Sequence, residues 1–125
     1  MSKAIATPNA PAAIGPYSQA VATGDLVFVS GQLPIDPATG AFAGNDIAAQ
    51  TRQSLTNIQA ILEANGMTMA NVVKTTVLLE DISEFAAMNA VYAEFFPANC
   101  PARAAFAVKD LPKGAKVEIE VVAGK

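Results

Sequence analysis

The sequence predicts one domain in which two helices cover the same face of a sheet. Stretches with helical periodicity alternate with stretches of strand character, in the order strands, helix, strand, helix, strands. No long polar, proline-rich or charged segment divides the 125 residues, so residues 1–125 are expected to form a single domain. Helices interleaved with a few strands pack on one face of the sheet, and the opposite face then needs another cover.

The first strand of clear character is Leu26–Val29, an apolar stretch between turn-forming residues. It is expected to form a hairpin with Ala20–Thr23. Pro34 and Pro37 cannot donate to a regular ladder, so the segment 34–40 is predicted to be a surface loop.

The first helix is predicted between Asp46 and Asn65, where the larger apolar residues recur at the spacing of one helix face. Asn45 or Asp46 can cap its start, and Gly66 can end it in a left-handed conformation. The buried stripe is expected to contain Ile47, Thr51, Leu55, Ile58 and Leu62.

Three further strands are expected. Val72–Leu79 is rich in β-branched residues and apolar on both faces, which is typical of a central strand covered on both sides. One of these covers could be another subunit. Two more strands are predicted at about Ala102–Val108 and Lys116–Val122, joined by the turn-forming stretch Leu111–Gly114.

A second helix is predicted from Asp81, whose side chain can cap the N-terminus, with Glu84 three residues later completing a capping box. Pro97 ends it. Asn89 lies four residues after Phe85 and is therefore expected close to the buried face. The stripe that faces the core is expected to contain Phe85, Met88, Tyr92 and Phe95.

Composition disfavours several classes of function. The longest apolar runs are only strand-sized, far below the roughly 20 residues of a membrane helix, and the first residues do not form a secretion signal, so we expect a cytoplasmic protein. Cys100 is the single cysteine and there is no histidine, so the usual ligands of zinc and most transition metals are missing. The net charge of −3 and the scattered basic residues disfavour nucleic acid as a partner.

The apolar content also bears on self-association. Apolar residues make up 52% of the chain, and a domain of this size buries only about two-thirds of the surface that its unfolded chain exposes. Burial between subunits would hide part of the remainder. Alternatively, the many alanines raise the apolar fraction without producing a large exposed patch.

Arg103 is the first candidate for chemistry. Alternation along its strand places Arg103 and Ala105 on one face, so the guanidinium is flanked by a small side chain. Its planar fork of donors suits a bidentate grip on a carboxylate. The alternative is a structural ion pair with Glu118 or Glu120, which share one face of the last strand. Those glutamates are either solvated or, if partly desolvated, able to carry a proton near neutral pH.

Other candidates have two readings each. Tyr17 either anchors its glycine- and proline-containing loop or contacts a ligand. Ser30 and Gly31 either present main-chain N–H groups to an anion or make a turn. Asn89 either satisfies a main-chain group or binds a ligand. Cys100 has no basic neighbour closer in sequence than Arg103 and is expected to be inert.

Ordered stretches along the whole chain resemble the RidA/YjgF family of reactive intermediate deaminases. The stretches that carry this resemblance are Asn9–Pro11, Ile14–Ala20, Val29–Pro34, Gln50–Leu55, Val73–Val77, Met88–Asn89, Pro101–Ala105, Leu111–Gly114 and Val117–Glu120. The resemblance implies an α+β, chorismate-mutase-like domain with a mixed sheet and two helices on one face. It also implies a homotrimer with a sheet-lined central barrel and three sites in the clefts between subunits.

The resemblance also assigns roles. Arg103 is expected to bind the carboxylate of 2-iminobutanoate or 2-iminopropanoate, and Glu120 to position the hydrolytic water. The same pocket is expected to be shaped or contacted by Tyr17, Ser30, Gly31, Asn89 and the main chain of Ala105. Some relatives carry a cysteine at the position of Ala105, so any role of a thiol there is absent from this chain.

The implied reaction needs no cofactor, since a protonated imine is already electrophilic and hydrolyses with water, a proton carrier and a carboxylate clamp. The products are a 2-oxo acid and ammonia. Such imines leave pyridoxal-phosphate-dependent dehydratases, so removal of metabolites that damage other enzymes is the expected role. The alternative is a non-catalytic module that binds small carboxylates, or a chaperone-like protein. RNA cleavage is disfavoured by the acidic charge and the lack of histidine.

Overall fold

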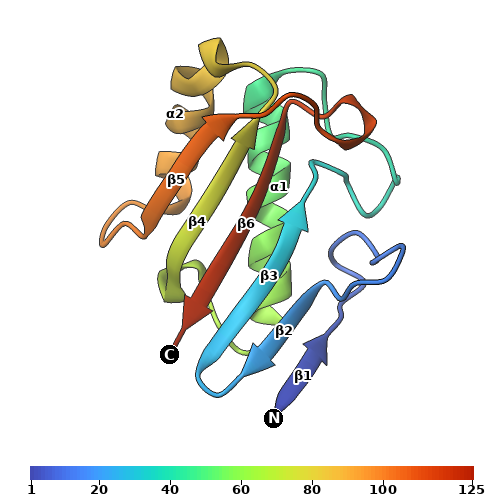
Figure 1. Cartoon of the computed structure of the whole chain (residues 1–125), viewed down its shortest axis with the longest axis vertical. Coiled ribbons are helices and arrows are strands. Elements are labelled where there is room, and N and C mark those ends of the chain that lie inside the picture. Colours follow the sequence, from blue (N-terminus) through green and yellow to red (C-terminus); the bar gives the residue numbers. More distant parts are fainter.

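The computed structural model of the protein describes residues 1–125 as one six-stranded sheet with two α-helices (Figure 1). The strand order across the sheet is β1-β2-β3-β6-β4-β5. The strands are β1 (Ser2–Ile5), β2 (Ala20–Thr23), β3 (Leu26–Gln32), β4 (Val72–Leu79), β5 (Ala102–Ala107) and β6 (Val117–Gly124). The helices are α1 (Ile47–Glu63) and α2 (Phe85–Phe95), with the short 3-10 helices η1 (Met69–Asn71), η2 (Ile82–Glu84) and η3 (Pro112–Gly114).

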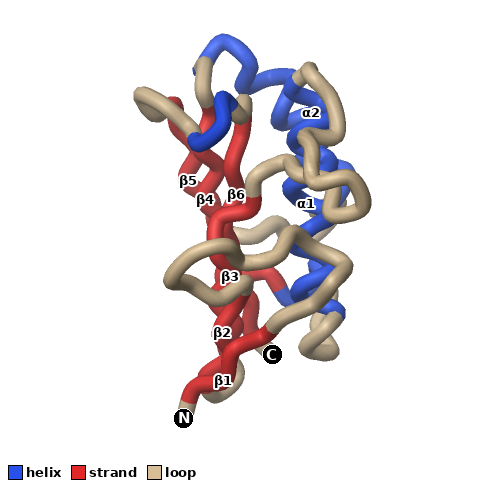
Figure 2. The backbone as a smooth tube through the Cα atoms, turned by 90° about the vertical axis from the view of Figure 1, so that its right-hand side faces the viewer, coloured by secondary structure: helices blue, strands red, loops and turns tan.

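The sheet is mixed. All neighbouring strands are antiparallel except β4 and β5, which are parallel because α2 carries the chain back to the start of the sheet between them. Both helices cover the same face (Figure 2), as the sequence predicts. The other face looks toward the viewer in Figure 1 and carries no helix, and we call it the open face.

The core lies between the helices and the sheet. The predicted stripe of α1 is buried along its whole length, from Ile47 to Leu62. Against it pack alternate residues of the central strands, which are Val27, Val29, Val77, Leu79, Val117, Ile119 and Val121. Because side chains alternate along a strand, the residues between these point to the open face.

Several sequence predictions are confirmed closely. β2 and β4 have the predicted bounds, and β3 begins at the predicted residue. Asp46 caps α1 by accepting a hydrogen bond from the Ala49 N–H at 2.7 Å. Gly66, with a φ of 72°, follows the end of α1 in the left-handed region. β1 was not predicted, because only Ile5 of its four residues is buried.

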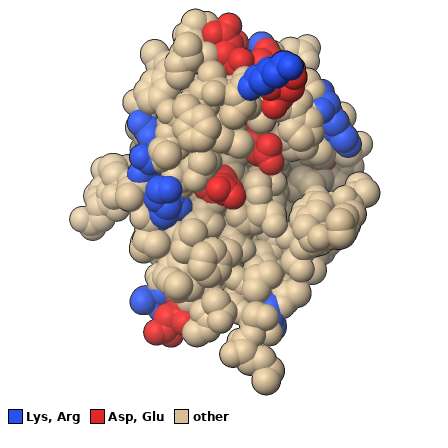
Figure 3. All heavy atoms as spheres, in the orientation of Figure 1, with Lys and Arg blue, Asp and Glu red and all other residues tan.

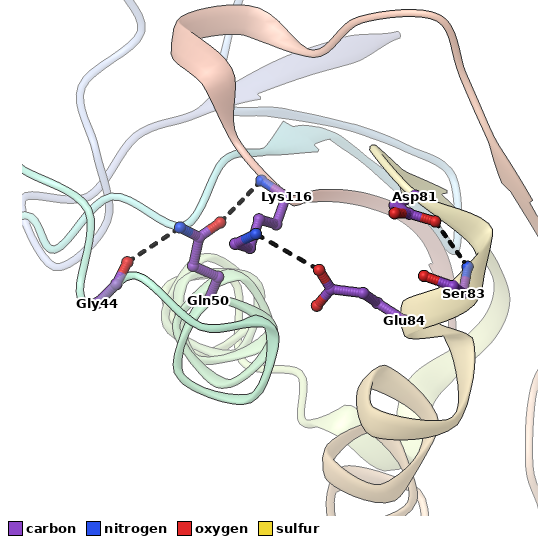
Figure 4. Close-up of polar contacts among 6 residues, drawn as sticks. All are labelled: Gly44, Gln50, Asp81, Ser83, Glu84 and Lys116. Carbon is purple, nitrogen blue, oxygen red and sulfur yellow. Dashed lines mark hydrogen bonds and ion pairs between the residues drawn. The ribbon is translucent and has the colours of Figure 1, made fainter.

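The start of α2 differs from the prediction. Asp81 caps the 3-10 helix η2 by accepting from the Ser83 N–H at 2.9 Å, and α2 begins only at Phe85. The predicted capping box is wrong, because the Glu84 carboxylate instead accepts from Lys116 Nζ at 3.4 Å (Figure 4). Within the predicted stripe Met88 and Tyr92 are buried, whereas Phe85 and Phe95 are only partly buried. Val91 and Phe96 complete the buried set.

The open face of the sheet carries exposed apolar side chains. Leu26, Phe28 and Phe106 are 41%, 46% and 47% exposed, and Leu78 on β4 is half-buried. Within a single chain, β4 is therefore fully covered on just one of its two faces. Figure 3 views this face, and most of the atoms visible on it belong to neither acidic nor basic side chains. None of the helices combines the length and apolar character that a membrane span requires.

Candidate functional site

A cavity of about 890 Å³ lies beside β3 and β6. Its walls are irregular segments, formed by residues 7–17, residues 33–40 and the Pro112-Lys113 turn. Four residues that the sequence singles out, Tyr17, Ser30, Gly31 and Glu120, lie on its lining, and so does Glu118. These candidate site residues therefore lie around one cavity in the structure.

A β-bulge shapes the floor of this cavity. Val29 pairs with Val121 and Gln32 with Ile119, so Ser30 and Gly31 together stand opposite the single residue Glu120. Gly31 has no side chain at the point where the Glu118 carboxylate lies, and a Cβ added there would collide with that carboxylate. The glycine therefore lets the Glu118 side chain pack directly against the main chain of β3.

Glu118 and Glu120 both project from the open face of β6, because Val117, Ile119 and Val121 between and beside them are buried. Glu118 is half-buried, and this burial raises the pKa of its carboxyl, with a further rise from the negative charge of Glu120. Glu120 itself is exposed. The surroundings of Glu118 therefore favour its protonated form up to a higher pH than is usual for a glutamate.

The bulge is also tied to the wall formed by residues 7–17. Ser30 Oγ donates to the Ser18 carbonyl at 2.6 Å, and the Ser30 N–H donates to the Gln19 carbonyl at 2.9 Å. Both donors of Ser30 are thus used within the chain, which favours the alternative in which this residue shapes the turn. Tyr17 is 52% exposed, and its hydroxyl accepts from the Ile14 N–H at 3.4 Å, so it both braces its loop and lines the cavity.

Buried amide side chains hold the irregular segments in and next to the other walls. Gln50 Nε2 donates to the Gly44 carbonyl and its Oε1 accepts from the Lys116 N–H, each at 2.9 Å (Figure 4). Asn57 Nδ2 donates to the carbonyls of Leu33 at 3.2 Å and Ile35 at 2.9 Å. Beyond the isolated bridge between Ile35 and Phe42 these segments form no strand ladder, and the amides satisfy some of their main-chain groups.

Arg103 lies elsewhere, at the edge strand β5 beside α2. Its Nη1 donates to Asn89 Oδ1 at 2.7 Å, and its guanidinium carbon lies 4.7 Å from the ring centroid of Tyr92 and 5.3 Å from that of Phe85. Two aromatic rings and an amide therefore orient the guanidinium. Arg103 is exposed and forms no ion pair within the chain, so the alternative of a structural pair with Glu118 or Glu120 is wrong.

The register explains why that ion pair is impossible. Arg103 pairs with Thr75 of β4, which is fully buried on the helix face, whereas Glu120 pairs with Thr76, which points to the open face. Ala105 follows Arg103 on the helix face, beside Val77. A single chain thus holds two separate groups. Arg103, Asn89 and Ala105 form one, and Tyr17, Ser30, Gly31, Glu118 and Glu120 form the other.

Sequence reasoning missed some residues of both groups. Glu118 was singled out only as a companion of Glu120, although Gly31 could have signalled a close approach to the main chain. Phe85 and Tyr92 were assigned to the core, and their contact with Arg103 has no local sequence signal. No group of three or more acidic or cysteine side chains comes together in a way that could hold a metal ion.

Comparison with known proteins places the chain in a family. The family model described as "Endoribonuclease L-PSP" matches residues 7–125. A RutC family protein of Sinorhizobium fredii is 57% identical over 122 residues, covering 98% of this chain and 97% of the relative. The 2-iminobutanoate/2-iminopropanoate deaminase of Salmonella typhimurium is 54% identical over 126 residues, covering 98% of each chain.

Solved structures agree. The YjgF gene product of Escherichia coli has a TM-score of 0.95 at 50% identity, covering 98% of each chain. Escherichia coli TdcF with bound serine has a TM-score of 0.95 at 44% identity, again covering 98% of each chain. The match of the family model, the identity over nearly the full length and the shared α+β architecture lead to one conclusion. The chain belongs to the RidA/YjgF family.

Proposed function

We propose that this protein hydrolyses small reactive 2-imino acids, such as 2-iminobutanoate and 2-iminopropanoate, to 2-oxo acids and ammonia. The observation that carries the proposal is an arginine without an acidic partner, oriented by Asn89 and two aromatic rings. Such a guanidinium is preorganised to receive a substrate carboxylate. Relatives that are 52–54% identical and named as deaminases of these two imines support the same reaction.

The carboxyls beside the cavity supply the second requirement, which is control of a proton. Glu118 is half-buried with a raised pKa, and its carboxylate packs against the main chain at Gly31, so we assign the proton carrier to Glu118. Glu120, to which the family resemblance assigns the positioning of the hydrolytic water, keeps that role in this proposal, and it lines the same cavity. Tyr17 and the bulge at Ser30 and Gly31 shape the space in which the imine and water meet.

The proposed reaction balances without a cofactor. With the carboxylate on Arg103, water attacks C2 of the protonated imine while Glu118 takes a proton from that water, which forms a carbinolamine. Glu118 then returns the proton to the amino nitrogen. As the C–N bond breaks, the carboxylate of Glu118 takes the proton of the C2 hydroxyl, whose oxygen becomes the carbonyl, and this proton passes to the departing ammonia, which leaves as ammonium. The enzyme provides orientation and one proton carrier, because the substrate carbon is already electrophilic.

We further propose that residues 1–125 act as one domain in a homotrimer, whose open sheet faces line a central barrel and whose sites lie between subunits. Two observations support assembly. Arg103 and Glu118 point away from each other in one chain, and the open face exposes Leu26, Phe28 and Phe106. A cytoplasmic location and supply of the imines by pyridoxal-phosphate-dependent dehydratases complete the proposed role.

A non-catalytic small-carboxylate-binding role is the second candidate. It is favoured by the relative solved with bound serine, since a carboxylate clamp serves binding as well as hydrolysis. The two candidates differ in turnover. A threonine dehydratase that generates 2-iminobutanoate, coupled to a reading of the rate at which the imine is lost, separates them directly.

The decisive variant is Arg103→Ala, which is expected to reduce imine loss to the uncatalysed rate while the oligomer stays intact. Arg52→Ala is the matched control, because Arg52 is also exposed and pairs with Glu94 of α2 at 2.8 Å without belonging to the site. The control is expected to keep wild-type turnover. A wild-type protein that does not hydrolyse the imine but still binds serine would contradict the deaminase proposal and favour the non-catalytic binding role.

A further inference from the structure

Residues 6–18, which lie between β1 and β2, form no helix or strand, yet they make up the largest wall of the cavity. Seven of the 18 lining residues come from this segment, Tyr17 among them. Within the segment the only main-chain hydrogen bond is from the Tyr17 N–H to the Gly15 carbonyl, at 2.9 Å. A wall of this length needs another source of order, because unpaired main-chain groups next to a core are costly.

That source is the side chain of Gln19, which is 4% exposed. Its Nε2 donates to the carbonyls of Thr7 at 3.1 Å, Ala10 at 3.3 Å and Pro11 at 2.7 Å. Its Oε1 accepts from the Thr7 N–H at 2.7 Å. One buried amide therefore gathers both ends of the turn formed by residues 7–11.

Gln19 also fixes the wall to the floor of the cavity. Its own carbonyl accepts from the Ser30 N–H at 2.9 Å, in the bulge that stands opposite Glu120. The residue thus connects the loop that carries Tyr17 to the strand against which Glu118 packs. Only a primary amide of this length offers both the donors and the acceptor that the turn requires.

We propose that Gln19 is a positioning residue for the reaction, which holds residues 6–18 in place as the wall of the substrate cavity without touching substrate. The part of this inference that concerns substrate rests on the proposed function. Glutamate at position 19 keeps the size and the acceptor but brings no N–H to the three carbonyls. Methionine keeps the approximate size with neither donor nor charge.

The test measures hydrogen-deuterium exchange of residues 6–18 and steady-state imine hydrolysis in the oligomeric protein carrying Gln19→Glu or Gln19→Met. Loss of the hydrogen bonds is expected to raise exchange of the protected amides of this segment, which include Thr7 and Tyr17, by roughly tenfold or more, with exchange of α1 and β4 unchanged. For turnover, KM is expected to rise about tenfold while kcat changes less than about twofold, because Arg103 and Glu118 remain intact. If Gln19→Glu does not fold because it buries a charge, Gln19→Met still tests the loss of the hydrogen bonds, since methionine carries no charge.

Gln50→Glu is the matched control. Gln50 is an equally buried amide that bonds the main chain at Gly44 and Lys116, outside the residues that line the cavity. Its substitution is expected to leave exchange of residues 6–18 at the wild-type rate. A similar rise in that segment in Gln50→Glu would reduce the effect to general destabilisation and overturn the inference.

Two further outcomes also overturn it. These are wild-type exchange of residues 6–18 in both Gln19 variants, and a fall in kcat with KM unchanged. A wild-type protein that does not hydrolyse imines would instead contradict the proposed function. Exchange needs no substrate, so in that case the role of Gln19 in holding the wall is decided by exchange alone.

Discussion

Arg103 and Glu120 lie on opposite faces of one sheet, although only β4 separates the strands that carry them. Arg103 is in register with the buried Thr75 and Glu120 with its neighbour Thr76, so alternation sends the two side chains apart. Glu118 shares the face of Glu120. No side-chain rotation brings Arg103 together with either carboxyl within one chain, so a site that uses both requires two chains.

Mixed oligomers test this requirement. Arg103→Ala and Glu118→Gln are each expected to be inactive alone, but co-assembly of the two at equal amounts restores sites that take Arg103 from one chain and Glu118 from another. Random assembly leaves roughly a quarter of the sites with both wild-type residues, so about that share of wild-type imine hydrolysis is expected.

The control for complementation is each variant refolded with itself, which is expected to stay inactive. Mixed samples that assemble fully, as judged by mass spectrometry of the oligomer, yet show no activity would place both residues in the same chain's site or remove one of them from catalysis.

The raised pKa of Glu118 predicts how stability depends on pH. The pKa of this carboxyl is higher in the folded protein than in the unfolded chain, where it is near 4.5. Its contribution to the free energy of unfolding is therefore complete below pH 4.5 and is lost as the pH rises through the pKa of the folded state. Glu118→Gln is therefore expected to gain free energy of unfolding relative to wild type between pH 4.5 and neutrality. Denaturant unfolding at fixed protein concentration measures it.

Glu120→Gln provides the internal check on the cause. Removing the negative charge of Glu120 is expected to lower the pKa of Glu118 only in part, because burial is the larger cause and remains. Glu63→Gln, at the exposed end of α1, is expected to show no such gain. Equal gains in Glu118→Gln and Glu63→Gln would contradict the assignment.

Gly31→Ala tests the close approach between β3 and Glu118. A Cβ at position 31 collides with the Glu118 carboxylate, which is the flexible end of its side chain, so the carboxylate is expected to swing away. We expect a large loss of kcat for imine hydrolysis with a stability loss of only about 1 kcal/mol. The comparison is Gly124→Ala on β6, where the added Cβ meets Leu26 Cδ2 at 3.3 Å and the Asp25 carbonyl oxygen at 3.9 Å. Unchanged kcat in Gly31→Ala would show that the position of Glu118 does not matter.

Local patterns were sufficient to predict most elements of the fold. The stripe of α1 repeats over four turns and has a good cap at Asp46, so its periodicity stands out from the sequence alone. β1 could not be found in this way, since it forms an edge strand whose order comes from pairing with β2. The hydrogen bond that Glu84 accepts also could not be predicted, because its partner Lys116 is 32 residues away in the sequence.

The candidate site shows the same division. Alternation within β5 and within β6 correctly grouped Arg103 with Ala105, and Glu118 with Glu120. Which of the two faces each group takes depends on the parallel register of β4 and β5, and that pairing leaves no local signature. The sequence therefore indicates the chemistry of the residues, whereas only the sheet shows that one chain separates them.

The hydrogen bond between Thr75 Oγ1 and Tyr92 Oη, at 2.8 Å, links β4 to α2 directly beneath Arg103. Both residues are buried, and burial raises the pKa of the Tyr92 hydroxyl, with the bond to Thr75 and the charge of Arg103 acting in the opposite direction. Thr75→Val leaves that hydroxyl without a partner and is expected to cost about 1–3 kcal/mol of unfolding free energy.

The double variant Thr75→Val/Tyr92→Phe removes both polar groups and should cost less than Thr75→Val alone, which a double-mutant cycle in denaturant measures. Tyr92→Phe keeps the ring under the guanidinium, so its KM for imine should stay close to that of wild type. A double variant less stable than Thr75→Val would mean that the hydroxyl pair is not what stabilises this junction.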